Sequence, residues 1–391
     1  MNIELDKNYY AVIRVIGVGG GGSNAVNRMM EDNISGCEFI ALNTDAQALM
    51  MSNADRKVLI GDSGLGAGSD PEMGKAAVEK SVNAIREAVK DADMVFVTCG
   101  EGGGTGSGAA PTVANIAREE GCLTVAVVTK PFTFEGSRRM SQAEEGIKNL
   151  RDDVDTLIVI PNDKLLEIAD ENTTLMGAFK LADQILKAGV RGVTDLITLP
   201  GLINLDFADV KSIIKDAGNA LLGDGTATGE NRAIKAAQVA INSPLIETSI
   251  EGAKGILLNI SGGSDLKLFE VNEAAEIVRN VASPNANIIF GAVIDENMKD
   301  QIKVTIIATG FKDKLLDKVI KTDKATKSKS AEKKKKAKEE LEDLRKDLQE
   351  DVVREGEKLF DSSEISENDF KSAEENDYLD IPTFLRDNKK L

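Results

Sequence analysis

The sequence predicts an α/β protein, in which a parallel sheet is followed by a long helix and a smaller α+β unit. Three observations lead to this prediction. Short runs of β-branched residues alternate with helical stretches, glycine clusters follow two of those runs, and residues 312–391 are rich in Lys, Glu, Asp and Ser. Strands that alternate with helices build a parallel sheet covered on both faces, with ligands at the carboxyl ends of the strands.

The first half of the chain contains the alternating elements. Candidate strands lie at Val12–Gly17, Glu38–Asn43, Lys57–Ile60, Met94–Thr98, Leu123–Val128 and Thr156–Ile160. Candidate helices lie near Asn24–Glu31, Pro71–Lys90, Gly108–Glu120 and Arg139–Leu150. Asp70 is the expected N-cap of the helix that begins at Pro71. Each glycine cluster therefore follows a strand, where a binding site is expected.

The second half begins with a helix predicted from about Thr174 to Leu196, which Pro200-Gly201 ends. Helices near Phe207–Ala217, Glu230–Ser243 and Glu270–Ala282 follow, with strands near Gly255–Ile260, Ala286–Ala292 and Gln301–Ala308. We expect a first domain at residues 1–173, a connecting helix at 174–200 and a second domain at 201–311. A charged linker at 312–375, partly helical or disordered, and a peptide at 376–391 complete the predicted organisation.

Composition argues against several classes of protein. The 391 residues carry 65 acidic and 48 basic side chains, a net charge of −17, which makes nucleic acid or anionic lipid a poor partner. The lysines of 312–338 could contact either, although a solvated linker is the favoured interpretation. No run reaches the roughly 18 apolar residues of a membrane span, and no signal peptide is visible, so a cytoplasmic protein without membrane insertion is expected. Histidine is absent, so hydrolysis must use carboxylates, a metal or positioned water.

The first glycine cluster, Gly17–Asn24, lies between a strand and a helix. Glycine lets the backbone approach phosphate oxygens, and the following helix directs its free N–H groups and dipole at the anion. Gly17, Gly19 and Gly22 fit G-x-G-x-x-G, and Asp45 ends the next strand, where dinucleotide enzymes place a ribose-binding acid. A dinucleotide-dependent oxidoreductase and a tight turn without ligand both stay open at this point.

The second cluster, Gly100–Gly108, indicates a different nucleotide site. It follows a neighbouring strand, so a second set of backbone donors lies beside the first and makes room for a triphosphate. Thr105 and Ser107 add hydroxyl donors, and a hydride-transferring domain does not need this loop. The P-loop pattern is excluded, because Ala76 follows Gly74-Lys75 where Ser or Thr is required.

Gly102–Gly108 (GGGTGSG) resembles the G-G-G-T-G-[ST]-G signature of the tubulin/FtsZ family. Further motifs resemble the FtsZ branch of that family, namely Gly17–Asn27, Asn43–Ala46, Pro131–Gly136, Pro161–Asp163, Gly201–Val210 and Asp380–Arg386. The resemblance covers residues 11–311 and resumes over the last dozen residues. It implies a Rossmann-like GTPase domain, a second domain that completes hydrolysis, and a GTP-dependent polymer at the division ring. Departures include Ser107 and Glu101, where the family commonly has Thr and Met.

The resemblance also implies the nucleotide contacts. The phosphates would be held by Gly20, Gly21, Gly22, Ser23, Asn24, Gly104, Thr105 and Gly106. Glu135 and Arg139 would meet the ribose and phosphates, while Asn162 and Asp183 would recognise the sugar and guanine. A carboxylate can accept two hydrogen bonds from guanine, and adenine offers no such pair of donors. The residues alone favour an exposed helix face for Asp183 and a surface charge for Arg139.

The catalytic segment of the family matches Asn204, Asp206 and Asp209 of this chain. The residues alone favour a pair of acids at a helix start, stabilised by the helix dipole. The resemblance implies that this segment enters the GTP pocket of the next subunit, where the two Asp residues polarise water and Asn204 orients the γ-phosphate. It implies head-to-tail filaments with Mg²⁺ bound through the nucleotide, without dedicated metal ligands, and leaves a monovalent cation open.

The C-terminal segment is a compact apolar cluster after the charged linker. Its residues are Asp380, Ile381, Pro382, Phe384, Leu385 and Arg386. Composition alone slightly favours a frayed terminus, whereas the resemblance implies a peptide that binds membrane tethers and division regulators. Three alternatives stay open: the oxidoreductase, a nucleotide-sensing scaffold without turnover, and a divergent relative without a role in division.

Overall fold

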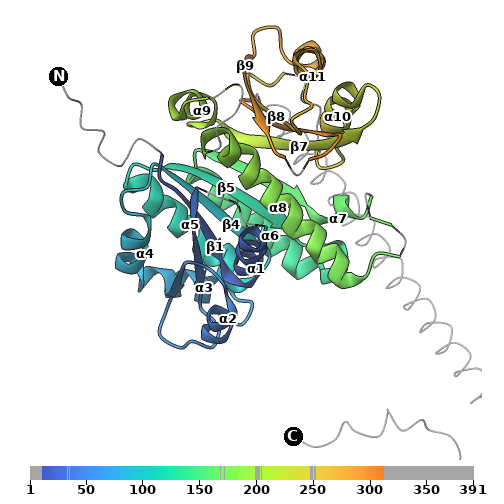
Figure 1. Ribbon diagram of the computed structural model, residues 1–391. Helices are drawn as coiled ribbons and strands as arrows, with labels where there is room; N and C mark the ends of the chain where they lie inside the picture. Colours follow the sequence, from blue (N-terminus) through green and yellow to red (C-terminus); the bar gives the residue numbers. More distant parts are fainter. Residues whose placement is uncertain are drawn as a thin grey trace, which may run out of the picture. The chain divides into compact units, whose positions relative to one another are not determined.

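A parallel sheet organises the first half of the structure (Figure 1). The computed structural model describes residues 11–311 except 33, 35, 168, 171, 199–202, 204, 247–249, 251 and 297. The predicted linker, the tail peptide and Asn204 therefore lie outside the described residues. None of the described helices is long and apolar enough to cross a membrane.

The six predicted strands of the first half are confirmed to within two residues. They are β1 (Ile13–Val18), β2 (Cys37–Asn43), β3 (Arg56–Leu59), β4 (Met94–Gly100), β5 (Leu123–Lys130) and β6 (Thr156–Pro161). They pair in parallel in the order β3-β2-β1-β4-β5-β6, so that Val15 lies opposite both Phe39 and Phe96. Strand order reverses next to β1, and the crevice at that point is the usual ligand position in such sheets.

Helices cover both faces of this sheet. One face packs against α1 (Gly19–Glu31) and α8 (Leu175–Thr198), and the predicted long helix is thereby confirmed. The other packs against α3 (Pro71–Glu79), α4 (Val82–Val89), α5 (Gly104–Glu119) and α6 (Ser137–Asp152). The single helix predicted at 71–90 is wrong, because the chain breaks at Ser81, whose hydroxyl accepts a hydrogen bond from the Gly61 backbone (3.1 Å).

Two helices begin inside the glycine clusters, which corrects their predicted starts. Helix α1 begins at Gly19 and α5 at Gly104, five and four residues before the predicted positions. Glycine has a poor intrinsic preference for helix, so the sequence pattern alone places these residues in loops. Tertiary contacts override that preference here, and each cluster supplies the first turn of a helix.

A smaller mixed sheet forms the second half. Its strands lie in the order β7 (Gly218–Thr228), β10 (Gln301–Thr309), β8 (Gly255–Gly262) and β9 (Asn287–Ile294). Strand β7 pairs in parallel with β6 at three residue pairs, which joins the two sheets. Helices α9 (Phe207–Ile214), α10 (Arg232–Ile241) and α11 (Leu268–Val281) accompany it, as predicted. Helix α8 contacts both sheets, because Gly189 lies against Val127 of β5 and Gly192 against Thr305 of β10.

Strand β7 was not predicted, because its sequence, GNALLGDGTAT, is rich in glycine. Glycine is normally depleted from strands and marks places where another backbone approaches closely. A Cβ on Gly223 or Gly225 would lie 2.2 Å from the carbonyl oxygen of Ala240 or Ala236. The glycines of β7 therefore allow α10 to pack directly on the strand.

Candidate nucleotide site

Two helix N-termini meet at the carboxyl edge of the parallel sheet. Helix α1 starts directly after β1 and α5 starts four residues after β4. Neither helix has a side-chain hydrogen bond at its N-cap, Val18 or Gly103. The first N–H groups of a helix have no partner within it, and the helix dipole makes that end positive. We call residues 19–22 and 104–107 together the glycine cradle.

The two halves of the glycine cradle touch each other. A Cβ on Gly19, which has φ +71°, would lie 3.0 Å from the Gly106 nitrogen. A Cβ on Gly22 would lie 2.4 Å from the Thr98 carbonyl oxygen of β4. Gly20 is exposed, and a Cβ there would meet nothing within 4 Å. The buried glycines thus bring the helices together, while Gly20 borders open space that a ligand can occupy.

Hydroxyl and amide side chains line the same edge of the sheet. Thr44, at the end of β2, shares a hydrogen bond of 2.7 Å with Thr105 Oγ1. Ser23 Oγ and Asn162 Oδ1 are buried and have no hydrogen-bond partner among the described residues. Buried polar atoms are normally paired, so these two atoms fit a bound polar ligand. This observation agrees with the phosphate and sugar roles expected for Ser23 and Asn162.

Asp183 on α8 faces α1. Its carboxylate pairs with Arg28 Nε (2.5 Å), and only 13% of its side chain is exposed. Burial raises the pKa of Asp183 above its ordinary value, and Arg28 opposes the rise. The exposed helix face favoured by the residues alone is therefore wrong. Arg28 was missed, although it lies one helical turn after Asn24 and that spacing could have placed it beside the site.

Glu135 and Arg139 pair with each other across one helical turn. Glu135 belongs to the short helix η1 (Thr133–Glu135), where its carboxylate also accepts from the Phe132 backbone (3.0 Å). Asp163, in α7 (Asn162–Leu165) after β6, accepts from the Thr133 backbone (2.8 Å). These bonds hold η1 beside Asn162, so the PFTFEG and PND segments lie next to each other. Arg139 itself is exposed.

Two further acids close to the glycine cradle cap helices. Asp45 accepts from the first backbone N–H groups of α2 (Ala46–Met51), at 2.9 and 3.1 Å. Asp70 caps α3 through the Glu72 backbone (3.0 Å), as predicted. Asp45 therefore has a structural role that explains it without a ribose, which weakens the dinucleotide alternative.

The two acids of the predicted catalytic segment lie elsewhere. Asp206 is the N-cap of α9 and accepts from the Asp209 backbone (2.7 Å), and both side chains are exposed. The carbonyl of Ile214, at the other end of α9, accepts from Thr156 Oγ1 (2.6 Å). Thr156 is the first residue of β6, so α9 packs at the amino edge of the sheet, opposite the glycine cradle (Figure 1). The structure does not bring these acids to the cradle of the same chain.

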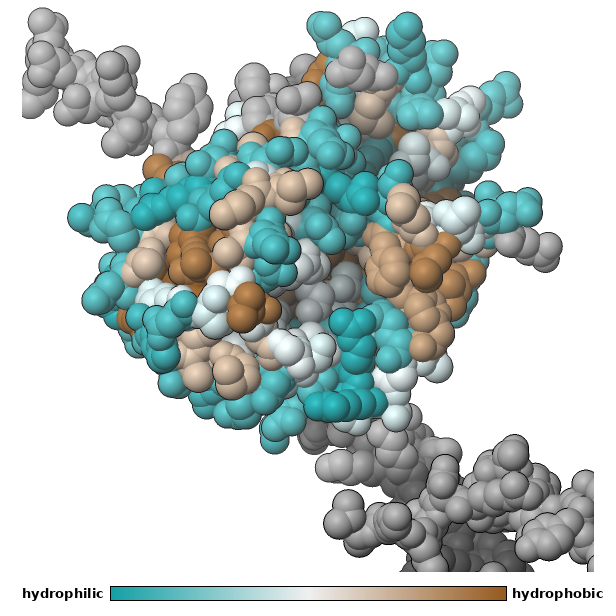
Figure 2. Space-filling view, turned by 90° about the horizontal axis from the view of Figure 1, so that it is seen from below, coloured by the Kyte–Doolittle hydropathy of each residue, from teal (hydrophilic) through white to brown (hydrophobic). Residues whose placement is uncertain are grey.

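Exposed apolar side chains flank the glycine cradle (Figure 2). The segments beside Thr44 and Gly104 carry Met50, Met51, Leu65 and Met73, and those around η1 and the start of α8 carry Phe134, Leu166, Leu175 and Met176. We call these eight residues the apolar rim. Phe134 stacks on buried Phe132 at 4.9 Å, which joins the rim to the core. In the second half, Leu268 and Phe269 at the start of α11 are 79% and 80% exposed.

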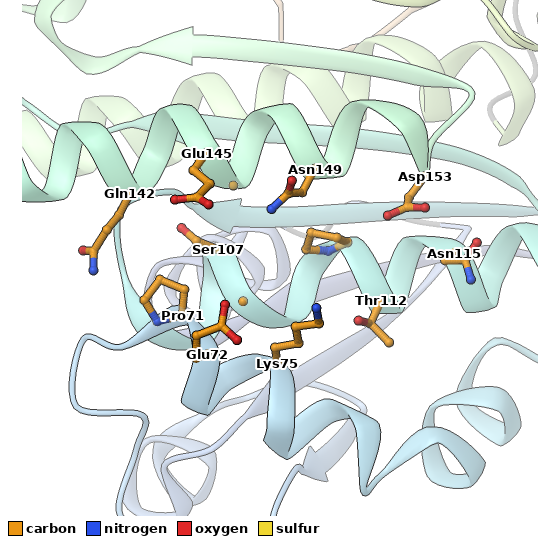
Figure 3. A pocket seen from close by; sticks show the side chains of 13 residues that line it. Pro71, Glu72, Lys75, Ser107, Thr112, Asn115, Gln142, Glu145, Asn149 and Asp153 are labelled. Carbon is orange, nitrogen blue, oxygen red and sulfur yellow. The ribbon is translucent and has the colours of Figure 1, made fainter.

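A separate groove of about 450 Å³ runs between α3, α5 and α6 (Figure 3). Gln142, Glu145 and Asn149 point into it from α6, and Lys75 and Glu72 come from α3. The groove lies on the outer side of α5 and contains neither the free N–H groups of α1 nor Asn162. It is not the nucleotide site that the glycine cradle indicates.

A doubly wound sheet with two glycine-bounded helix N-termini at its carboxyl edge defines a nucleotide-binding protein. Residues 12–170 match the GTPase domain of the tubulin/FtsZ family, and residues 218–312 match the C-terminal domain of the FtsZ family. The chain is 47% identical to FtsZ from M. jannaschii, solved as an empty dimer, with a TM-score of 0.75 over 78% of this chain and 89% of that one. The chain therefore belongs to the tubulin/FtsZ family, and its first domain is a GTPase domain.

Two more distant structures share the fold. CetZ2 from Haloferax volcanii, a GTPγS-bound protofilament, is 18% identical, with a TM-score of 0.67 over 82% of this chain and 99% of that one. CetZ1 from the same organism, a GDP-bound monomer, is 20% identical, with a TM-score of 0.66 over 77% and 94%. At these identities the likeness concerns the fold alone.

Proposed function

We propose that this chain is a GTP-dependent, self-assembling GTPase that forms head-to-tail protofilaments of a cytoplasmic division ring and cleaves GTP between subunits. One observation carries the proposal. The cradle that suits a triphosphate lies at one edge of the sheet, and the exposed Asp206 and Asp209 lie at the other. A contact that joins opposite ends of two copies does not close on itself and produces open filaments.

The binding half of the site belongs to residues 1–173 and the start of the helix at 174–200. The phosphates would rest on the first turns of α1 and α5, against Gly20, Gly21, Gly22, Ser23 and Asn24 and against Gly104, Thr105 and Gly106. Asn162 and Asp183 would bind the sugar and guanine, with Glu135 and Arg139 at the ribose and phosphates. Mg²⁺ would be held chiefly by the phosphates and would neutralise their charge.

The catalytic half belongs to the second domain, 201–311. Asp206 and Asp209 of one subunit would polarise water at the γ-phosphate of the next, with Asn204 orienting that phosphate. Phosphoryl transfer needs positioning and charge stabilisation more than covalent chemistry, so a protein without histidine can perform it. The two half-sites make hydrolysis depend on assembly.

The apolar rim supports contact between subunits. Leu65 is 88% and Met51 is 82% exposed on one side of the cradle, and Met176 is 69% exposed on the other. Contiguous apolar patches on a monomer often mark interaction surfaces, and burying them would favour association. Leu268 and Phe269 give the half that carries α9 a matching apolar element. The M. jannaschii relative was solved as a dimer, which agrees with self-association here.

Replacement of Asp209 by Ala tests the catalytic half. GTP binding and assembly should persist, while phosphate release at concentrations that assemble should fall by about 100-fold, because a positioned acid is lost. Glu276→Ala is the matched control, since it removes an exposed acid from α11 of the same half. Light scattering and phosphate release would be followed together with GTP and GDP. Normal turnover in D209A would exclude the catalytic role, and turnover without assembly would exclude the shared site.

The tail peptide would connect the filaments to other proteins of the cell. Asp380, Ile381, Pro382, Phe384, Leu385 and Arg386 would bind membrane tethers and division regulators beyond a linker at 312–375. Deletion of 380–391 should leave filaments intact in vitro and abolish their recruitment to the membrane in cells. Retained recruitment would exclude this role for the peptide, and normal division with the gene removed would indicate a divergent relative.

A further inference from the structure

Glu101 is a buried acid three residues before the second half of the glycine cradle. Its backbone N–H donates to the Thr129 carbonyl of β5 (2.9 Å), and the residue is only 4% exposed. A Cβ on Gly146 of α6 would lie 2.3 Å from Glu101 Oε2 and 2.9 Å from the Cβ of Ser107. The carboxylate is therefore enclosed between α5 and α6, behind the turn that leads into the cradle.

The surroundings of Glu101 offer little compensation for a negative charge. Glu101 Oε1 accepts from Cys99 Sγ of β4 (3.4 Å), whereas Oε2 has no hydrogen-bond partner among the described residues. None of the ion pairs formed by the described residues includes Glu101. A carboxylate that lacks both water and a cation is costly in its ionised form.

The same position connects Glu101 with the loop that forms the cradle. The Gly102 backbone donates to Ser107 Oγ (2.8 Å), which closes the turn from residue 102 to the first turn of α5. Ser107 also lies beside the Glu101 carboxylate, because a Cβ on Gly146 would meet both Glu101 Oε2 (2.3 Å) and the Cβ of Ser107 (2.9 Å). A change in the charge of Glu101 therefore occurs next to the residue whose hydroxyl fixes the turn.

Titratable groups near Glu101 are few. Burial raises the pKa of Glu101 to about 7, and the polar neighbours Ser107 and Cys99 only partly oppose the rise. The Cys99 thiol on β4 is neutral, because burial raises its pKa well above the ordinary value. From β5 and α6 the neighbours are Thr129 and Gly146, which carry no charge.

The groove of Figure 3 shares two lining residues, Ser107 and Gly146, with the surroundings of Glu101. Ser107 and Gly146 line the groove and also contact Glu101, so that little more than Gly146, which has no side chain, separates the carboxylate from solvent. The charged side chains along the groove are Glu72 and Lys75 from α3, Glu145 from α6 and Asp153 after α6.

We propose that Glu101 is a positioning residue of the phosphate loop that takes up a proton when a nucleotide binds, so that nucleotide affinity follows the protonation of Glu101. This inference rests on the proposed guanine nucleotide site. Bound phosphates bring negative charge to the first turn of α5, and an ionised carboxylate behind that turn repels them. Protonation removes the repulsion, and the turn held by Ser107 keeps its N–H groups directed at the phosphates.

The size of the effect follows from linkage. If bound phosphates raise the pKa of Glu101 by about one further unit, nucleotide affinity falls about sevenfold between pH 6 and pH 8.5. Titration of the nucleotide adds its own pH dependence, which is common to all variants of the protein. The difference between the full-length protein and Glu101→Gln therefore isolates the contribution of Glu101.

Calorimetric titration of GDP into the full-length protein tests the inference without polymer formation. Measurements at pH 6, 7, 8 and 8.5, in buffers of different ionisation enthalpy, give both the affinity and the number of protons taken up. Glu101→Gln and Glu101→Met remove the titrating group in a polar and an apolar form, and circular dichroism confirms their folding. Glu145→Gln is the control, because it removes an exposed acid next to Gly146.

We expect the native protein and E145Q to lose about sevenfold more affinity than E101Q and E101M between pH 6 and pH 8.5. Proton uptake near pH 7 should be larger in the native protein than in E101Q by a substantial fraction of one proton. Equal pH dependence and equal proton uptake in the native protein and E101Q would overturn the inference alone. A failure of every protein to bind GDP at any pH would overturn the proposed nucleotide site and the inference with it.

Discussion

Two glycines in one helical turn should respond to the same substitution in opposite ways. Gly20 and Gly22 both belong to the first turn of α1. A Cβ on Gly22 would lie 2.4 Å from the Thr98 carbonyl oxygen and 2.8 Å from the Gly17 carbonyl carbon, whereas a Cβ on Gly20 would meet nothing within 4 Å. The atoms that the Gly22 methyl group meets belong to the backbone, so they cannot rotate away, and α1 must move off the sheet by about 1 Å.

The expected magnitudes follow from these contacts. Gly22→Ala should destabilise the protein by about 1–3 kcal/mol through overpacking. Gly20→Ala should leave stability unchanged or raise it by up to about 1 kcal/mol, because alanine lowers the conformational entropy of the unfolded chain and has a higher helix propensity than glycine. At about 2 °C per kcal/mol, the melting temperatures of the two variants should differ by roughly 2–8 °C.

Thermal unfolding of nucleotide-free protein, followed by far-UV circular dichroism, would measure this difference, and GDP titration would measure binding. G20A should retain its stability but lose affinity, because its methyl group enters the space next to the exposed N–H groups of the cradle. Identical melting temperatures for G20A and G22A would refute the packing argument. Unchanged GDP affinity in G20A would refute the placement of the phosphates.

Two further predictions concern buried acids. The pKa of Glu101 is about 7 in the folded protein against 4.5 ordinarily. The contribution of Glu101 to the free energy of unfolding is therefore fully present below about pH 4.5 and is lost as the pH rises through 7. E101Q should therefore be more stable than the native protein by roughly 3 kcal/mol at pH 8 and by little at pH 5. Urea unfolding measures this, and the same difference in the free energy of unfolding at both pH values would contradict the prediction. Arg28→Met should raise the pKa of Asp183 further, so on acidification GTP affinity should begin to fall at a higher pH than in the native protein. Arg86→Met, which removes an exposed ion pair with Glu119 and Glu120, is the control and should follow the native curve.

The sequence was sufficient for the order of elements because hydrophobic periodicity is a local signal. Buried β-branched runs and helical spacing located β1 to β6 and the helix at 175–198. The same local reasoning failed where glycine belongs to a regular element. Strand β7 and the first turns of α1 and α5 exist because a close backbone neighbour requires a residue without a side chain, and that neighbour is distant in the sequence.

The candidate site was predictable only in part, for a similar reason. The glycine clusters and Asn162 follow strand ends, so their common edge could be derived from strand–helix alternation. The pairing of Arg28 with Asp183 joins residues 155 positions apart, and no local pattern reports it. The capping role of Asp45 was equally hidden, because an acid after a strand fits both a ribose ligand and a helix cap.

The acids around the glycine cradle supply a physical reason for the proposed sharing of the active site between subunits. Among the described residues, Asp45 and Asp70 cap helices, Asp163 holds Thr133, and Glu135 and Asp183 pair with Arg139 and Arg28. Glu101 is enclosed behind the loop. These side chains would have to give up an existing bond or leave a buried position to orient water, and no imidazole is available in their place. On the opposite edge Asp206 also caps a helix, but the exposed Asp209 carboxylate forms no hydrogen bond or ion pair with the described residues, so a second subunit could supply the missing acid without breaking an existing bond.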